Sequence, residues 1–231
     1  MKLELLGFKI CPFVQRVSLM LHVKNIPHTV TYLNPKEPPE WLASLSPLGK
    51  VPLLRVKDDA GHDVAVVFES QVINEFLDEA FTLAVMPQDP LERARQRGFV
   101  AVADGLLAAM WNWVTAKDVA SVEQARAALC QSLSVLEQAL PEPVQVFAGD
   151  ARGFGIVDCA MLPIFMRLEL LESSGVTALP CEDLPRVHAY RHALLALPVA
   201  NASVVPEFAA LYLGFVKGQG GLLGEALARK P

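Results

Sequence analysis

Cys11 stands directly before a proline, in the stretch FKICPFVQRV near the start of the chain. Pro12 suits the first position of a helix, where its missing N–H removes no hydrogen bond, so the pair places Cys11 at or beside the N-cap. Unpaired backbone N–H groups and the helix dipole then favour the thiolate, which predicts a pKa below the free value of about 8.5. A reactive nucleophile is one interpretation, and a small buried cysteine that only packs is the other.

The residue three positions after Cys11 is Val14, so no second cysteine follows at the spacing of a dithiol motif. An oxidised Cys11 could not be resolved by a neighbouring thiol. Any redox cycle would pass through a mixed disulfide with an external thiol, which a second thiol attacks in turn. The sequence therefore predicts a small-thiol partner if Cys11 is reactive.

Val51 precedes a proline at the start of a predicted strand, in SPLGKVPLL. A cis Val51–Pro52 bond would turn the chain so that the N–H and C=O of Val51 can pair with an extended peptide ligand, in the manner of an added strand. An ordinary proline in an edge strand is the alternative.

Glu69 and Ser70 lie where the following helix begins, in the stretch FES. A carboxylate, a hydroxyl and free helix N–H groups match the two ends of an α-amino acid, with the amine on Glu69 and the carboxylate on Ser70 and the helix terminus. Simple helix capping is the alternative.

The remaining chemically active residues give weaker signals. His188 and His192 are four residues apart and could share a helix face, but nothing nearby completes a metal site, so no metal is expected. Cys130, Cys159 and Cys181 show no tight spacing, and we expect them to pack without structural disulfides.

Composition excludes several classes of protein. With 52% hydrophobic and 19% charged residues the chain predicts a folded globular protein, and a net charge of −5 argues against a nucleic-acid or acidic-membrane surface. Glu4 interrupts the apolar N-terminus, so no signal peptide is expected and a cytoplasmic location follows by default. The apolar stretch 99–114 contains Asp104 and is too short for a membrane span, which predicts a buried helix.

The elements that must position these residues fall into two groups. Residues 1–81 predict the order βαβαββα: a strand to Phe8, a helix from Val14, a strand over 28–33, a short helical piece, a hairpin, and a helix over 70–80. A linker with two prolines over 82–90 follows. Residues 91–231 predict helices only, listed as 91–116, 122–140, 156–172, 184–196 and 202–217, and then a glycine-rich tail.

Taken together, the helix-capping Cys11, the Val51–Pro52 pair before a hairpin and the Glu69–Ser70 pair resemble the cytosolic glutathione transferases. The resemblance covers nearly the whole chain, with a thioredoxin-like N-terminal domain, a short linker and an all-helical C-terminal domain. CPFVQRV resembles the omega-type and omega-like bacterial members, which carry cysteine where other classes carry tyrosine or serine.

The resemblance implies a glutathione-dependent transferase that uses glutathione as co-substrate, with a two-domain subunit that pairs as a homodimer. Cys11 would be the catalytic thiol, acting on a small electrophilic or disulfide acceptor. A lysine that binds the glycyl carboxylate in omega-type proteins is replaced by Pro38, and Lys36 would substitute for it. The residues implied to bind glutathione are Phe13, Lys36, Lys50, Val51, Pro52, Glu69 and Ser70.

The resemblance also bears on the helical domain. Its first long helix faces the acceptor pocket, but Trp111 and Trp113 are two positions apart and so lie on different faces, which predicts that at most one of them lines that pocket. The helix-capping motif of the family has Gly155 in place of Ser or Thr and keeps Asp158, which we interpret as structural.

Three functions remain open at this point. The first is thiol transfer, deglutathionylation or reduction of a dehydroascorbate-like acceptor through a Cys11–glutathione mixed disulfide. The second is conjugation of glutathione to an electrophile, and the third is a non-enzymatic binding protein on the same scaffold.

Overall fold

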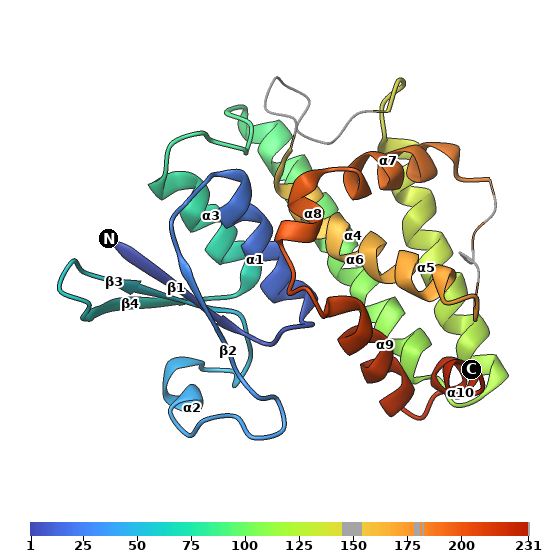
Figure 1. Cartoon of the computed structure of the whole chain (residues 1–231). Coiled ribbons are helices and arrows are strands. Elements are labelled where there is room, and N and C mark those ends of the chain that lie inside the picture. The colour runs from blue at the N-terminus through green and yellow to red at the C-terminus, as the bar shows by residue number, and fades with distance from the viewer. Residues whose placement is uncertain (145–153, 178–180, 182, 231) are drawn as a thin grey trace.

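The computed structural model describes residues 1–144, 154–177, 181 and 183–230. The chain folds into a sheet with flanking helices at the N-terminal end and a helical part beside it (Figure 1). The prediction of an α/β thioredoxin-like part followed by helices is therefore confirmed.

The N-terminal part contains β1 (Lys2–Gly7), α1 (Pro12–Val23), β2 (Thr29–Tyr32), α2 (Leu42–Leu45), β3 (Leu53–Lys57), β4 (Asp63–Phe68) and α3 (Ser70–Ala80). The strands form one sheet in the order β2-β1-β3-β4. β1 runs parallel to β2 and antiparallel to β3, and β3 and β4 form the predicted hairpin. The predicted order βαβαββα is the observed one.

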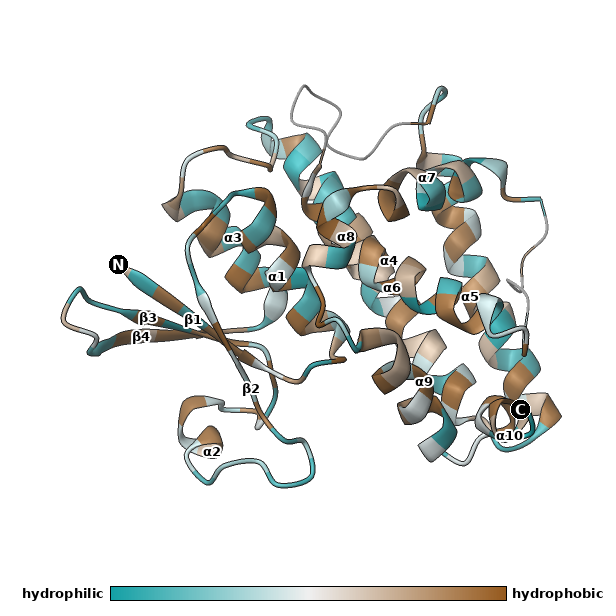
Figure 2. Cartoon of the chain, viewed as in Figure 1, coloured by the Kyte–Doolittle hydropathy of each residue, from teal (hydrophilic) through white to brown (hydrophobic). Residues whose placement is uncertain are grey.

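Alternating side chains of the strands supply two apolar faces, because successive residues of a strand point to opposite sides. Leu3 and Leu5 belong to the main core with α1 and α3, whereas Leu6 packs with Leu42 of α2 and Leu53 on the other face. In Figure 2 hydrophobic residues mark the strands and the central helices, and the loop before α2 is largely hydrophilic.

Gly7 lets α1 begin close behind the end of β1. A Cβ at this position would lie 2.2 Å from Val14 Cγ2, a distance that side chains do not tolerate. Any larger residue would displace the first turn of α1. The glycine therefore helps to fix the position of Cys11, which begins that turn.

The helical part contains α4 (Pro90–Thr115), α5 (Val119–Ala139), α6 (Ile156–Ser173), α7 (Pro185–Leu195), α8 (Pro198–Ala202), α9 (Phe208–Gly218) and α10 (Leu222–Ala228). By length and composition α4 could cross a membrane, but it packs against α5 and α6 in the helical part. α1 packs against α6, so one apolar core extends across both parts of the chain.

Two predictions for the C-terminal end are wrong. The expected helix over 202–217 is interrupted after Ala202, and α9 begins only at Phe208. The intervening residues include Pro206, which lacks the N–H that a continuous helix needs. The glycine-rich tail also forms a helix, α10, rather than an extended tail.

The tail glycines allow close packing. A Cβ on Gly221 would lie 2.5 Å from the carbonyl oxygen of Val114 in α4, and one on Gly224 would lie 2.5 Å from that of Val216 in α9. These two residues bring α10 against the backbone of both helices. Composition alone predicts a tail here, because the contact that requires the glycines is not visible in the sequence.

Asp158 has the structural role that the sequence predicts. Its Oδ2 accepts a hydrogen bond from the Gly155 N–H at 2.6 Å, which caps the start of α6, and its Oδ1 accepts one from the Tyr190 hydroxyl of α7. Burial raises the pKa of Tyr190 well above its ordinary value, so the phenol remains a donor.

The expectation that Cys130 and Cys181 are unpaired packing residues is wrong, because the two form a disulfide. Their Cα atoms lie 5.4 Å apart, in the range that a disulfide needs, although 51 positions separate them in the sequence. This approach of α5 to the segment before α7 depends on the tertiary fold. Cys159 is buried and free, in agreement with the expectation for that residue.

Candidate functional site

Cys11 is the N-cap of α1, and Pro12 is the first helical residue, as predicted. The Cys11 N–H donates to the carbonyl oxygen of Phe8 at 3.1 Å, which closes the turn between β1 and α1. The thiol is half-buried. Its position therefore combines a helix terminus with partial exclusion of water.

The predicted lowering of the Cys11 pKa is wrong in its net direction. Burial raises the pKa of the thiol above its ordinary value, and this outweighs the backbone N–H groups of Val14 and Phe13 and the guanidinium groups of Arg167 and Arg16, which all lower it. The sequence identifies the helix terminus but not the walls that desolvate the sulfur.

A cavity of about 120 Å³ lies beside the first turn of α1, and we call it the polar cavity because two charged side chains and two serines contribute to its wall. The Val51–Pro52 peptide bond in its wall is cis, which confirms that interpretation of the sequence. Lys36 is exposed in the loop before α2 and is not part of the wall. The cavity is lined by Phe13, Ser46, Leu48, Lys50, Val51, Pro52, Phe68, Glu69 and Ser70.

Six residues chosen from the sequence thus meet in one cavity, although they come from three separate stretches of the chain. They lie on the first turn of α1, in the segment before β3, and at the start of α3: Phe13, Lys50, Val51, Pro52, Glu69 and Ser70. Glu69 adopts a φ of 67°, a left-handed conformation that is rare outside glycine and is concentrated at functional positions.

Arg16 contacts two residues of the cavity wall, Ser70 and Phe13, and is absent from the predicted set. Its side chain is 1% exposed, its Nη1 donates to Ser70 Oγ at 3.2 Å, and its guanidinium lies 5.2 Å from the centre of the Phe13 ring. Its Nη2 donates to Asp104 Oδ1 of α4 at 2.6 Å. Arg16 therefore places a positive charge next to Ser70 and links the cavity to the helical part.

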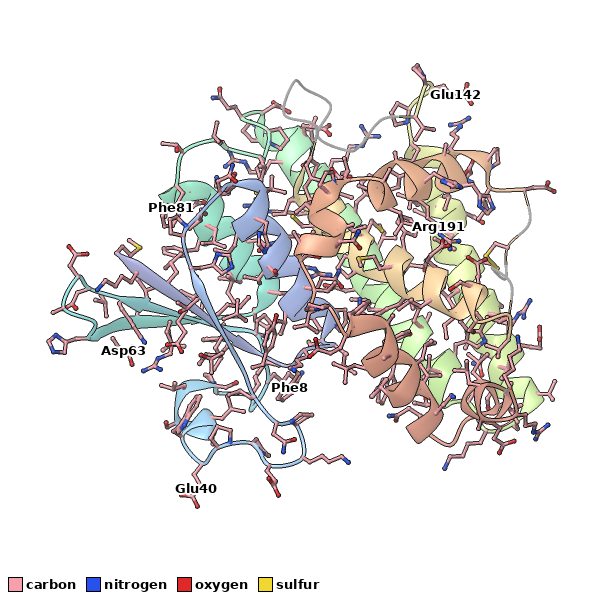
Figure 3. All side chains as sticks on the ribbon, viewed as in Figure 1. Phe8, Glu40, Asp63, Phe81, Glu142 and Arg191 are labelled. Carbon is pink, nitrogen blue, oxygen red and sulfur yellow. A yellow bond between two sulfur atoms is a disulfide. The ribbon has the colours of Figure 1, made fainter. Side chains whose placement is uncertain are left out.

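A second cavity, of about 250 Å³, is lined by Cys11 itself. Apolar and aromatic side chains make up nearly all of its wall, and it contains the Cys11 thiol and one guanidinium, that of Arg167. Figure 3 labels Phe8 of its wall, which lies between the sheet and α9. The lining residues are Phe8, Ile10, Cys11, Pro12, Pro35, Leu107, Met110, Trp111, Val114, Arg167, Tyr212 and Phe215.

The two tryptophans of α4 separate as their spacing predicts. Trp111 lines the apolar cavity, is 52% exposed, and has its ring centre 6.0 Å from that of Phe215. Trp113 is 1% exposed and belongs to the core, so of the two candidates for the acceptor pocket Trp111 is the one that lines the apolar cavity. A separation of two positions turns a helical side chain by about 200°, which explains the difference.

Arg167 of α6 is the other residue that the sequence reading missed. It is 3% exposed and lines the apolar cavity together with Cys11. One signal was available: an arginine stands in the middle of the apolar stretch CAMLPIFMRLELL, and a charge buried in such a helix requires a partner or a function.

No group of three or more metal-ligating side chains occurs among residues 1–144, 154–177, 181 and 183–230. His188 and His192 both lie on α7, where the sequence places them. His192 lines a separate groove beside Glu169.

Comparison with known proteins agrees with this geometry. A family model described as the N-terminal domain of glutathione S-transferase matches residues 10–80. The chain is 30% identical over 218 residues to glutathione S-transferase omega-1 of Mus musculus, and the match covers 92% of this chain and 86% of the mouse protein.

Solved structures show the same fold. Glutathione transferase Omega 3C from Trametes versicolor superposes with a TM-score of 0.74 at 23% identity, covering 90% of this chain and 92% of the other. A rice glutathione transferase solved in complex with glutathione superposes with a TM-score of 0.79 at 24% identity, covering 95% and 96%.

A thioredoxin-like sheet domain joined to a helical domain in this order is the architecture of the glutathione transferases. The chain belongs to the glutathione S-transferase superfamily, and it is an omega-like glutathione transferase within it.

Proposed function

We propose that this omega-like glutathione transferase is a cysteine-type thiol transferase that works through a Cys11–glutathione mixed disulfide. The observation that carries the proposal is the position of Cys11 in the wall of the apolar cavity, two residues from a residue that lines the polar one. Cys11 lines the apolar cavity, and Phe13, two residues further along the same turn, lines the polar one. Glutathione in the polar cavity and an acceptor in the apolar cavity would meet at this sulfur.

We expect glutathione to occupy the polar cavity in one orientation. The Glu69 carboxylate suits the ammonium of the γ-glutamyl end, and the Ser70 hydroxyl with the N–H groups of α3 suits its carboxylate. The backbone of Val51 suits the cysteinyl residue, paired as an added strand. Lys50 is the cation of this cavity, whereas Lys36 lies outside it and is not assigned a contact.

The proposed reaction consists of two thiol–disulfide exchanges. The Cys11 thiolate attacks the glutathione sulfur of an acceptor–glutathione disulfide, so a Cys11–glutathione bond forms and the acceptor leaves as a thiolate that takes up a proton. A second glutathione thiolate attacks the glutathione sulfur of this mixed disulfide, which releases glutathione disulfide and regenerates the Cys11 thiolate. Val14 occupies the position of a resolving cysteine, so the second exchange requires external glutathione.

The apolar wall bears on the acceptor. Four aromatic rings face the cavity, and they favour an apolar or aromatic acceptor over a small polar one such as dehydroascorbate: Phe8, Trp111, Tyr212 and Phe215. Conjugation of glutathione to an electrophile is the competing reaction. The thiol at position 11 disfavours it, because a thiol can exchange with a disulfide of glutathione and hold the glutathione as a mixed disulfide, whereas a hydroxyl cannot.

Substitution of Cys11 tests the proposed chemistry. Cys11→Ala should abolish glutathione-dependent reduction of a mixed disulfide while the fold, measured by circular dichroism, is unchanged. Cys159→Ala is the matched control, because Cys159 is a free cysteine that is 0% exposed, and this variant should keep full activity. Full thiol-transfer activity in Cys11→Ala would refute the proposal.

Calorimetry separates an enzyme from a binding scaffold without substrate. Wild-type protein and Cys11→Ala should both bind glutathione, because the polar cavity is intact in both. No binding at millimolar glutathione would favour a protein that uses the scaffold for another purpose.

The proposed assembly is a homodimer, in which the N-terminal domain of one copy contacts the helical domain of the other. Sedimentation equilibrium should give the mass of two chains. The mass of one chain at assay concentrations would contradict this part of the proposal.

A further inference from the structure

Arg167 is a buried cation without a carboxylate partner in the described part of the chain. The two other buried arginines differ in this respect. Arg16 donates to Asp104, and Arg191 donates to Glu169 and Glu172. A guanidinium removed from water without an anion is unfavourable, so its retention points to a negative charge that forms beside it.

Neutral groups hold Arg167 in one place. Its Nη1 donates to Gln15 Oε1 at 2.7 Å and to the Pro163 carbonyl oxygen at 2.6 Å, and its Nη2 donates to the Ile10 carbonyl oxygen at 2.7 Å. These bonds use three of the five guanidinium N–H groups. Ile10 directly precedes Cys11, so this contact ties the charge to the turn that carries the thiol.

Two aromatic rings complete the enclosure. The guanidinium carbon lies 5.1 Å from the centre of the Phe208 ring and 5.5 Å from that of Tyr212. Burial lowers the pKa of Arg167 to about 10, with Tyr212 and Cys11 opposing this, so the guanidinium is still charged at neutral pH. Burial raises the pKa of Tyr212 to about 12, so the phenol is neutral there.

The charged groups around Cys11 leave one positive charge uncompensated. Arg16 of α1 interacts electrostatically with the Cys11 thiol, but its charge is paired with Asp104 of α4. Lys9, on the loop before Cys11, is paired with Glu207 at the start of α9 at 2.6 Å. Arg167, which comes from α6, has no such partner in the described residues.

We propose that Arg167 is the counter-ion of the Cys11 thiolate and a positioning residue for thiol chemistry in this enzyme. This inference rests on the proposed function in assuming that Cys11 reacts as a thiolate. The thiol loses its proton to solvent, and the fixed guanidinium, which keeps its own protons, balances the negative sulfur. The thiolate that forms at Cys11 thus supplies the negative charge that Arg167 otherwise lacks.

The test is the pH dependence of Cys11 alkylation by iodoacetamide, a probe that needs no glutathione. The sulfur displaces iodide and forms a carbon–sulfur bond, and peptide mass spectrometry measures the rate at Cys11 alone. Arg167→Gln and Arg167→Met remove the charge, and Arg167→Lys keeps it. Arg191→Gln is the matched control, because Arg191 is also a buried arginine of the helical part. Arg191 lies far from Phe8, which lines the same cavity as Cys11 (Figure 3).

The midpoint of the rate–pH curve is the primary readout. Each unit by which it rises lowers the thiolate fraction at neutral pH tenfold, but the more basic thiolate is about threefold more nucleophilic, so the rate falls only about threefold. We expect both neutral variants to move the midpoint upward and to lower the rate at pH 7 by about threefold or more. Arg167→Lys and Arg191→Gln should keep the wild-type midpoint.

Two results would overturn the inference. One is a wild-type midpoint in either neutral variant that retains the native circular dichroism spectrum. The other is an equal upward shift in Arg167→Lys and Arg167→Gln, which would assign the effect to the shape of the side chain rather than its charge. If the alkylation curves show the expected shifts but the wild-type protein has no glutathione-dependent activity, the result would instead contradict the proposed function.

Discussion

Replacing Lys24 with methionine should destabilise the protein strongly, because Lys24 forms a buried clamp on the segment between the two domains. The lysine side chain is 0% exposed, and that of its partner Asp78 is 7% exposed. Lys24 Nζ donates to Asp78 Oδ1 at 3.0 Å and to the carbonyl oxygens of Phe81 and Leu83 at 3.1 and 2.9 Å.

The size of the effect follows from what the substitution leaves behind. Methionine preserves most of the side-chain volume, but among the described residues Asp78 then keeps hydrogen bonds only from the N–H groups of Val85 and Met86, at 2.7 and 3.1 Å. Removing one partner of a buried ion pair costs about 3–5 kcal/mol. At about 2–4 °C per kcal/mol for a chain of this size, the melting temperature should fall by roughly 6–20 °C.

Thermal and urea unfolding, followed by circular dichroism, measure this loss. Lys57→Met is the matched control, because Lys57 donates to Glu4 at 2.6 Å from a side chain that is 24% exposed, and its loss should cost about 1 kcal/mol or less. If Lys24→Met is no more destabilised than Lys57→Met, the reasoning about the buried clamp is refuted.

Three further predictions concern the two cavities and the contact between the domains. Trp111→Ala should raise the KM for an aromatic acceptor roughly two- to tenfold and leave that for glutathione unchanged, since an aromatic contact contributes about 0.5–1.5 kcal/mol; an equal rise in both would contradict separate cavities. Ser70→Ala should raise the KM for glutathione about tenfold or more in steady-state kinetics, through loss of a hydrogen bond to a charged group. An unchanged KM would show that the γ-glutamyl end of glutathione does not bind at Ser70. Arg97 holds the pKa of Glu75 below its ordinary value. The ion pair therefore stabilises the protein fully at a pH above the ordinary pKa of a glutamate, and this stabilisation is lost as the pH falls through the lowered pKa of Glu75. Urea unfolding should show a weaker acid dependence in Arg97→Gln, and an unaltered dependence would exclude this pair as its source.

The sequence predicts the N-terminal domain well because its signals are local. Apolar runs and a proline after Cys11 mark element boundaries, and the observed order agrees. The C-terminal end depends on contacts between distant residues. The glycines of α10 and the Cys130–Cys181 disulfide have causes that become visible only when the helices are packed.

The same distinction applies to the site. Cys11, Val51 and Ser70 were found because each lies beside a proline or at the start of a helix, where the backbone itself supplies binding groups. Arg16 and Arg167 were missed because their roles come from tertiary neighbours, a serine 54 positions away and a carbonyl group 157 positions away. The error in the Cys11 pKa has the same origin, since the helix terminus is local and the desolvating walls are not.

The central claim is that Cys11 is the sulfur that exchanges with glutathione. Mass spectrometry of the folded protein after incubation with glutathione disulfide tests it most directly. We predict one glutathione adduct, located on the peptide that contains Cys11 and absent from Cys11→Ser. Failure of the wild-type protein to form an adduct, or an adduct on Cys159 with Cys11 unmodified, would contradict the account.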